Sequence, residues 1–219
     1  AVVDVEGHVV LALGDVEQAI LPRSAVKALQ ALPLVTSGAA DEVGLSDRAL
    51  ALACASHLGE ADHIDEVTNA LGRIGAGVDD LACGAHWPSS PEAARALAAA
   101  GGALTAVHNN CSGKHAGFLA LARRLGAPLV GYTTVDHPVQ LEVRATIEAV
   151  CGTPLGTPVV DGCSAPTWPV PLRALAHGFA RFGTGAGLSA EQVSQSVRLF
   201  GANRLTPLPR DNRKRIVSA

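Results

Sequence analysis

One ten-residue stretch, 108–117, constrains the chemistry of this chain more than any other. It holds a thiol, a hydroxyl, an amine and two imidazoles within eight residues, and its two glycines let the backbone approach a neighbouring group closely. The following residues, 118–126, have the apolar spacing of a helix that ends at a glycine. We therefore expect the polar cluster at or just before a helix N-terminus, where free N–H groups favour anions and lower the pKa of a thiol.

The composition narrows the class of protein. The chain has 219 residues, 48% of them hydrophobic, which is enough for one sizeable core. A net charge of −3 argues against a nucleic-acid partner, and the chain shows neither an apolar run of membrane-spanning length nor a signal-peptide pattern. Five cysteines, an odd number, do not resemble a disulfide framework. We expect a cytoplasmic protein with reduced thiols and no membrane partner.

The two ends of the chain lead to an expectation about its extent. The sequence contains no methionine, and residues 205–215 are basic and lack apolar periodicity. Such a run is typical of a solvated tail rather than of a nucleic-acid patch. We expect a single domain over residues 1–219 that is incomplete at the N-terminus and at the C-terminus.

Hydrophobic periodicity predicts helices mixed with a few short strands. Strands are expected in a hairpin over residues 1–13, with its turn at Glu6-Gly7, and over 128–132 and 158–163. Helices are expected over 21–32, from the cap Ser46 to His57, and over 62–74, 89–101, 118–126, 136–150, 171–182 and 190–200. This pattern favours an α/β or α+β fold with a central sheet flanked by helices.

Ser24 and Lys27 form the first candidate constellation. Three positions apart on a helix, they share a face, and a neutral lysine there can take the serine proton to generate a nucleophile without a histidine. Lysine occurs only three times against fourteen arginines, which favours a chemical role of the amine where a lysine stands in a motif. The spacing alone is weak evidence, because serine and lysine meet in this way by chance in many helices.

Cys111, Lys114 and the distant Cys163 form the second constellation. The chain has no paired C-x₂-C unit of the kind that builds a structural zinc site. Two interpretations remain open: the cysteines are buried apolar residues, or they make a three-ligand zinc site that is open to water or substrate, with lysine as an unusual ligand. Asp161, two residues before Cys163, would serve as an outer partner of such a site.

Three further groups have a simpler interpretation. A lone histidine near a helix end, such as His57 beside Cys54 and Ser56, is more often a cap or a core residue than a ligand. For the segment His86-Trp87-Pro88, a role in packing is favoured over a role as a binding loop. The glycine-rich run 183–187 lacks the lysine of a phosphate-binding loop, which predicts a turn.

Five motifs, taken together and in order, resemble one family. They are Pro-Arg-Ser-Ala-Val-Lys at 22–27, Cys-Ala-Ser-His at 54–57, Asn-Cys-Ser-Gly-Lys-His-Ala-Gly at 110–117, Asp-His-Pro at 136–138 and Asp-Gly-Cys-Ser-Ala-Pro at 161–166. The set resembles the rhizobial-type (class 3, asparaginase II) L-asparaginases over most of the chain. The run at 110–117 is quite specific, whereas the first motif is not.

The resemblance implies a fold like that of the serine β-lactamases and penicillin-binding proteins, and an amidohydrolase that converts L-asparagine to L-aspartate and ammonia. It also implies a homodimer. The catalytic residues that it implies are Ser24 as nucleophile, Lys27 as base, Arg23 and Ser56. The implied substrate-binding residues are His57, Asn110, His115 and Asp161, and the implied zinc ligands are Cys111, Lys114 and Cys163. The zinc ion would orient the substrate amide rather than activate the attacking water.

One departure from the family pattern keeps two alternatives open. In the family the second serine pairs with another lysine, from a Lys-x-Gly-Ala-Glu-Gly-like segment. Nothing in this sequence matches that segment, since the remaining lysine, Lys214, lies in a basic run. The alternatives are a Ser-Lys hydrolase of penicillin-binding type, and a truncated, inactive zinc-binding domain. The missing lysine favours the second of these.

Overall fold

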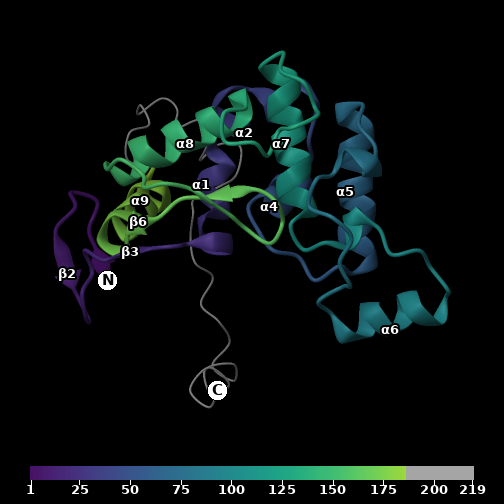
Figure 1. Cartoon of the computed structure of the whole chain (residues 1–219), viewed down its shortest axis with the longest axis horizontal. Coiled ribbons are helices and arrows are strands. Elements are labelled where there is room, and N and C mark those ends of the chain that lie inside the picture. The colour runs from purple at the N-terminus through teal and green to yellow at the C-terminus, as the bar shows by residue number, and fades with distance from the viewer. Residues whose placement is uncertain (186–219) are drawn as a thin grey trace.

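Helix α7 (Ser112–Arg124) is the element around which the described part of the chain is packed. The computed structural model describes residues 1–185. In α7 every residue from Ser112 to Ala122 is buried, and the helix contacts α2, α3, α4, α5 and α8. A helix that is buried on all sides belongs to the core rather than to the surface. Figure 1 shows α7 between α5 on one side and the group formed by α1, α8 and α9 on the other.

The described residues form nine α-helices, three short 3₁₀ helices and six strands of two or three residues. The helices are η1 (Arg23–Val26), α1 (Lys27–Gln30), α2 (Leu32–Thr36), α3 (Ala39–Glu42), α4 (Asp47–Ala53), α5 (Ala61–Ile74), η2 (Val78–Asp80), α6 (Pro91–Ala99), η3 (Ala106–His108), α7, α8 (Pro138–Cys151) and α9 (Leu172–Thr184). The strands are β1 (Val2–Val3), β2 (Val9–Leu11), β3 (Ala19–Ile20), β4 (Val159–Val160), β5 (Pro166–Thr167) and β6 (Val170–Pro171).

The prediction of a central sheet is wrong for residues 1–185. The strands there form three separate antiparallel pairs, β1 with β2, β3 with β6 and β4 with β5. Val10 and Val160 are 68% and 76% exposed, whereas Val170 of β6 packs in the helical core, so no continuous strand layer covers that core in the described residues. The described architecture is mostly helical, with the small sheets at the margins of the helical core.

Several local predictions are confirmed. The hairpin at the N-terminus is present, and Gly7 takes a positive φ of 92° in its turn. Ser46 caps α4 by accepting a hydrogen bond from the backbone of Ala49, and the helices expected near 62–74, 89–101, 136–150 and 171–182 are α5, α6, α8 and α9. These segments carry their own start and stop signals, so local chemistry fixes them.

Other predicted boundaries are wrong. The helix expected over 21–32 is replaced by three short elements, η1, α1 and α2, with Pro33 in the first turn of α2, where its missing N–H costs nothing. Helix α4 ends at Ala53 rather than at His57. Residues 128–132 form turns instead of a strand, with Thr134 donating to the carbonyl of Gly131. The helix expected over 190–200 and the end of the glycine-rich run at 183–187 lie outside the described residues.

The position of α7 differs from the prediction in a way that shapes the site. The helix begins at Ser112, so the polar residues expected before it occupy its first turns, and Cys111 is the residue at its N-cap. Gly113 permits this, because a Cβ atom there would lie 2.6 Å from the carbonyl oxygen of Leu52 in α4. Glycine therefore brings the two helices together directly beneath the polar stretch.

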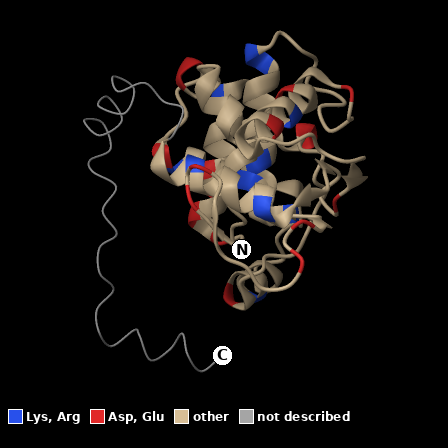
Figure 2. Cartoon of the chain, turned by 90° about the vertical axis from the view of Figure 1, so that its left-hand side faces the viewer, with Lys and Arg blue, Asp and Glu red and all other residues tan. Residues whose placement is uncertain are grey.

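The periphery of the described structure is polar and mixed in charge. Helix α6 has no buried residue, and in Figure 1 it lies at the opposite end of the molecule from the β1–β2 hairpin. Lysine and arginine are interspersed with aspartate and glutamate in the view of Figure 2. None of the described helices has both the length and the hydrophobicity that crossing a bilayer requires.

Candidate active site

A cavity of about 200 Å³ gathers most of the residues that the sequence singles out. Four separate segments contribute to it: η1, the loop around residue 86, the start of α7 and the loop between β4 and β5. Its lining is Arg23, Ser24, His86, Asn109, Asn110, Cys111, Asp161, Gly162 and Cys163. Except for Gly162, every lining residue has a polar or ionisable side chain, which suits a small polar ligand.

Ser24 and Arg23 reach the cavity from η1. Both residues are exposed, so the Ser24 hydroxyl is accessible to a ligand in the cavity. The Arg23 guanidinium donates to Oδ1 of Asp161 from two nitrogens, at 3.0 and 2.9 Å. Because Asp161 also accepts from the backbone N–H of Gly162 at 2.8 Å, this carboxylate is held in place at the cavity wall.

The backbone is strained at two points beside the cavity. Arg23 and Ser164 are the two residues other than glycine in the described chain with positive φ, at 47° and 68°. Such conformations cost about 1–3 kcal/mol and cluster at functional sites. Ser164 lies in a tight loop where its N–H donates to the carbonyl of Asp161, while the N–H of Asp161 donates to Ala165. This loop presents both Asp161 and Cys163.

Lys27 lies just behind η1 and is almost completely buried, at 1% exposure. Its Nζ contacts the carbonyl oxygens of Ala55 and Asn110, at 2.9 and 3.3 Å, and Oγ of Ser56 at 2.8 Å. Burial lowers the pKa of Lys27, and the neighbouring Cys111 partly opposes that shift. Nζ donates to all three of its partners, the two carbonyl oxygens and the hydroxyl oxygen of Ser56.

Ser56 and His57 follow α4 in the sequence. A hydrogen bond from His57 holds this segment against the start of α7. Ser56 is exposed, whereas His57 is 4% exposed and lies outside the cavity. His57 accepts from the N–H of Gly59 at Nδ1, so its Nε2 carries the proton and donates to Oγ of Ser112, at 2.7 Å. Burial, reinforced by the neighbouring His63 and Lys27, lowers the pKa of His57 to about 4. His57 therefore holds the Ser56 loop against α7 as a neutral ring.

Two thiols and an amine converge where α7 meets the β4–β5 loop. Nζ of Lys114 lies 3.1 Å from Sγ of Cys163, and Cys111 lies one turn before Lys114. The hydrogen bond with Cys111, together with His115 and Lys114, lowers the pKa of Cys163, and the hydrogen bond with Cys163 raises the pKa of Cys111. The three side chains thus bring two sulfur atoms and one amine together.

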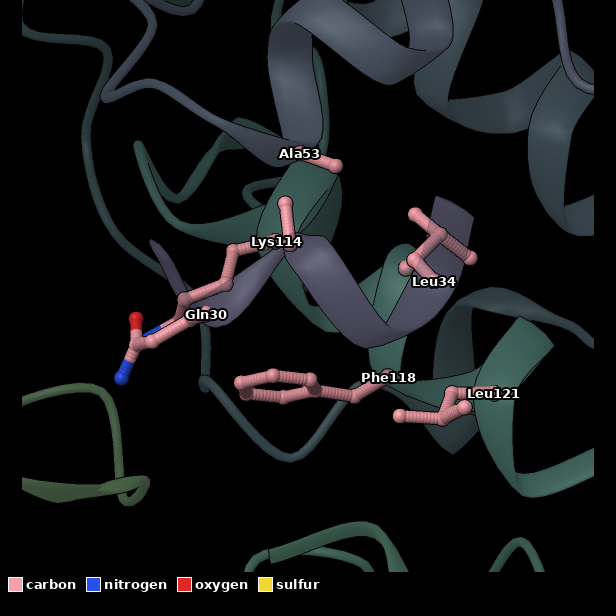
Figure 3. A pocket seen from close by; sticks show the side chains of 8 residues that line it. Gln30, Leu34, Ala53, Lys114, Phe118 and Leu121 are labelled. Atoms are coloured by element: carbon pink, nitrogen blue, oxygen red, sulfur yellow. The ribbon is translucent and has the colours of Figure 1, made fainter. Parts of the chain in front are cut away.

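This donor set fits a zinc ion of the open, three-ligand kind. Among residues 1–185, the only group of three His, Cys, Asp or Glu side chains close enough to share an ion is Asp4, Glu6 and His8 in the hairpin, so a third protein ligand beside Cys111 and Cys163 would have to be Lys114. Lys114 also borders a void of about 10 Å³ with Gln30 and Phe118 (Figure 3). All five cysteines are free in the structure.

His115 lies behind the cavity wall rather than in it. Its side chain has no exposed area, and Nδ1 lies 2.6 Å from the hydroxyl oxygen of Tyr132. Predicted as a substrate-binding residue, it does not line the cavity, and neither do Lys27, Ser56, His57 and Lys114, which lie around it. The predicted residues that line it are Arg23, Ser24, Asn110, Cys111, Asp161 and Cys163.

Two polar side chains of the cavity were absent from the predicted site. His86 lines it from a loop that the sequence favoured as packing, and its Nδ1 lies 2.6 Å from the carbonyl oxygen of Trp87. Asn109 donates to the carbonyls of Cys83 and Gly84 and accepts from the N–H of Cys111. The adjacent pair Asn109-Asn110 was the available signal for Asn109, whereas nothing local marks His86 as a lining residue.

Comparisons with known proteins bear on this geometry. A family model described as L-asparaginase II matches residues 1–207, which includes every residue of the cavity. A comparison with curated proteins finds no match.

Proposed function

The chain belongs to the L-asparaginase II family, a family of hydrolases whose membership implies hydrolysis of L-asparagine, and we propose that Ser24 is the nucleophile of that reaction. One observation carries the proposal: the Ser24 hydroxyl opens into a polar cavity while the buried Lys27, with its lowered pKa, lies one 3₁₀ turn away. This is the spacing of an S-x-x-K nucleophile, with the base one turn from the hydroxyl.

In the proposed first step, Oγ of Ser24 attacks the side-chain amide carbon of L-asparagine. The Ser24 proton passes to the neutral Lys27 amine and then to the departing nitrogen, so that the C–N bond breaks and ammonia leaves. Water then attacks the acyl-enzyme, releases L-aspartate and restores the Ser24 hydroxyl. Lys27 forms its hydrogen bonds with Ala55, Ser56 and Asn110. Proton transfer from Ser24 to Lys27 therefore needs either a rotation of one side chain or passage of the proton through the Ser56 hydroxyl.

The cavity wall supplies charges for both ends of an amino acid substrate. The exposed Arg23 guanidinium suits the α-carboxylate, and Asp161, with Asn110 beside it, suits the α-ammonium group. We propose that Cys111, Lys114 and Cys163 hold a zinc ion at the same wall. Such an ion would supply a Lewis acid that orients the amide. Chelation followed by metal analysis tests the zinc proposal. The proposal predicts that Cys111→Ala removes bound zinc.

The family pattern pairs the second serine with another lysine, whereas in the described residues Ser56 pairs with Lys27, at 2.8 Å. This pairing favours an active enzyme over the inactive alternative, because Ser56 is already held without another lysine. The implied homodimer stays a prediction, which sedimentation of the purified chain tests.

Ammonia release from L-asparagine by three serine variants tests the nucleophile assignment. Ser24→Ala should reduce kcat by several orders of magnitude, because the attacking atom is gone. Ser56→Ala should leave a lower but measurable rate, since the nucleophile and its base remain. The exposed Ser89, which does not line the cavity, provides the matched control Ser89→Ala, expected to match the wild type. Near-normal turnover by Ser24→Ala would refute the assignment.

A further inference from the structure

His86 lines the candidate active site, but the proposed mechanism gives it no role. It is an exposed residue in the loop between η2 and α6. Its Nδ1 lies 2.6 Å from the carbonyl oxygen of Trp87. Because a carbonyl oxygen can only accept a hydrogen bond, Nδ1 carries a proton and donates to this carbonyl. In the neutral ring Nε2 is therefore an acceptor, and it has no hydrogen-bond partner within residues 1–185.

The loop is anchored to the rest of the protein on both sides of His86. Before His86, the side-chain amide of Asn109, which is 6% exposed, donates to the carbonyls of residues 83 and 84 at 2.9 and 3.1 Å. After His86, the backbone N–H of Ser90 donates to the carbonyl of Leu58 at 2.9 Å. A group that is already ordered loses little conformational freedom when a ligand binds. His86 is thus a preorganised acceptor at the cavity.

The other side-chain acceptors of the cavity have a hydrogen-bond partner or a proposed role. Oδ1 of Asn109 accepts from the backbone N–H of Cys111, and Oδ1 of Asn110 accepts from the thiol of Cys111 at 3.2 Å. Asp161 accepts from Arg23 and is assigned to the α-ammonium group of the substrate. The hydroxyl and the sulfur atoms of the lining belong to the proposed nucleophile and zinc ligands. These assignments leave the imidazole Nε2 available to the substrate.

The substrate has donors that the same assignments leave without a partner. In the proposed complex, Arg23 faces the α-carboxylate, Asp161 faces the α-ammonium group, and the side-chain amide is oriented through its oxygen. The amide nitrogen carries two N–H groups, which lose their hydrogen bonds to water when the substrate enters the cavity. An acceptor beside them recovers part of that loss, whereas an N–H without a partner weakens binding.

We propose that His86 is a substrate-binding residue that selects the amide: its Nε2 accepts a hydrogen bond from the side-chain N–H₂ group of L-asparagine. The inference deepens the proposed function and rests on it, because it uses the places assigned to the two α groups. An ester of L-aspartate has no N–H at this position and gains nothing from Nε2. The carboxylate of the product would bring an oxygen lone pair against the lone pair of Nε2, which favours product release.

Kinetics with an amide and an ester test the proposal. Formation of L-aspartate from L-asparagine and from L-aspartate β-methyl ester is followed at about pH 8.5, where free imidazole is neutral. His86→Phe keeps a ring without the acceptor, so kcat/KM for L-asparagine should fall about 10-fold, whereas kcat/KM for the ester should change by less than about two-fold. His86→Gln places an oxygen near the Nε2 position and should recover most of the loss.

The matched control is His8→Phe. His8 is an exposed histidine of the hairpin that does not line the cavity, so this variant should match the wild type with both substrates. An equal fall for the amide and the ester in His86→Phe would show a merely structural role and overturn the proposal. An unchanged kcat/KM for L-asparagine in His86→Phe would also overturn it.

Binding to a Ser24→Ala background gives a second readout, which does not depend on turnover. Isothermal titration with L-asparagine and with L-aspartate β-methyl ester measures the preference for the amide as a ratio of two Kd values. Adding His86→Phe should reduce this preference about 10-fold. If the wild type releases no ammonia, the proposed function fails, while the titration still decides the role of His86. A preference that His86→Phe leaves unchanged, or no binding of L-asparagine at all, would overturn the inference.

Discussion

At the scale of single residues, the sequence identifies the chemical groups more readily than their partners. The motifs mark Ser24, Lys27 and Ser56, but nothing local shows that Lys27 bonds to Ser56, because the two are 29 positions apart. His115 sits in the most specific motif, yet its partner Tyr132 lies in a segment that the sequence predicted as a strand. Pairings of this kind depend on the packing of α7, which periodicity alone does not determine.

The protonation state of Lys27 leads to the first prediction. Lys27→Arg keeps a cation that cannot lose its proton at working pH, so ammonia release should fall by at least about 10²-fold, the usual contribution of a general base. Lys27→Gln, which is smaller, should lose a similar factor while keeping a donor for the carbonyls of Ala55 and Asn110. Steady-state assays with circular dichroism as a folding control check both variants, and wild-type turnover by either would remove Lys27 from the mechanism.

The buried ring of His57 leads to a prediction about pH. Its folded-state pKa of about 4 is below the ordinary 6.5, so the unfolded chain takes up a proton first as the pH falls. The contribution of neutral His57 to the free energy of unfolding is fully present above pH 6.5. It is lost as the pH approaches 4, which lowers the free energy of unfolding by up to about 3 kcal/mol. Urea unfolding between pH 7 and 4 should show this loss in the wild type and a shallower one in His57→Gln. If the free energy of unfolding fell equally steeply with pH in the two proteins, the result would contradict a neutral, buried His57.

At the scale of elements, helices with their own caps are predicted well, and those set by tertiary packing are not. Ser46 and Ser90 each accept a backbone N–H at the start of a helix, and α4 and α6 begin where the sequence indicates. The start of α7 was missed, because its first residues are polar and glycine-containing and form helix only where α4 packs against them. Tertiary contacts override local propensity at that point.

The close approach of α4 and α7 predicts opposite effects for two glycine substitutions. Gly113→Ala would place a Cβ atom 2.6 Å from the Leu52 carbonyl, and such overpacking should cost about 1–3 kcal/mol of unfolding free energy. Gly72→Ala, in α5, meets no atom within 4 Å and should stabilise by about 0.5–1 kcal/mol. Urea denaturation checks the pair. A stabilising Gly113→Ala would show that the two helices are not in direct backbone contact.

At the scale of the whole molecule, the family is recognisable from the motifs, whereas the layered architecture is not. The match over residues 1–207 agrees with the order of the five motifs. The expected central sheet fails in the described residues, because the runs at 1–13 and 158–163 form only two-stranded pairs and residues 128–132 form turns. Short β-branched runs carry no information on how many neighbours a strand will find.

The proposed zinc site joins distant parts of the chain, which predicts an effect on global stability. Its ligands come from α7 and from the β4–β5 loop, so bound metal should favour the folded state by mass action. A chelator should lower the melting temperature of the zinc-loaded wild type by several degrees. Cys111→Ser should melt at one temperature with or without chelator. An unchanged melting temperature for the zinc-loaded wild type would place any bound metal elsewhere.

The most direct test of the central claim is to trap the acyl-enzyme. The chain is mixed with L-asparagine, quenched in acid during turnover, and digested for mass spectrometry of the peptides that carry Ser24 and Ser56. We predict that the Ser24 peptide alone gains the mass of one aspartyl group, and that Ser24→Ala shows neither this adduct nor ammonia release. An aspartyl group on Ser56, or turnover without any acylated peptide, would contradict the mechanism.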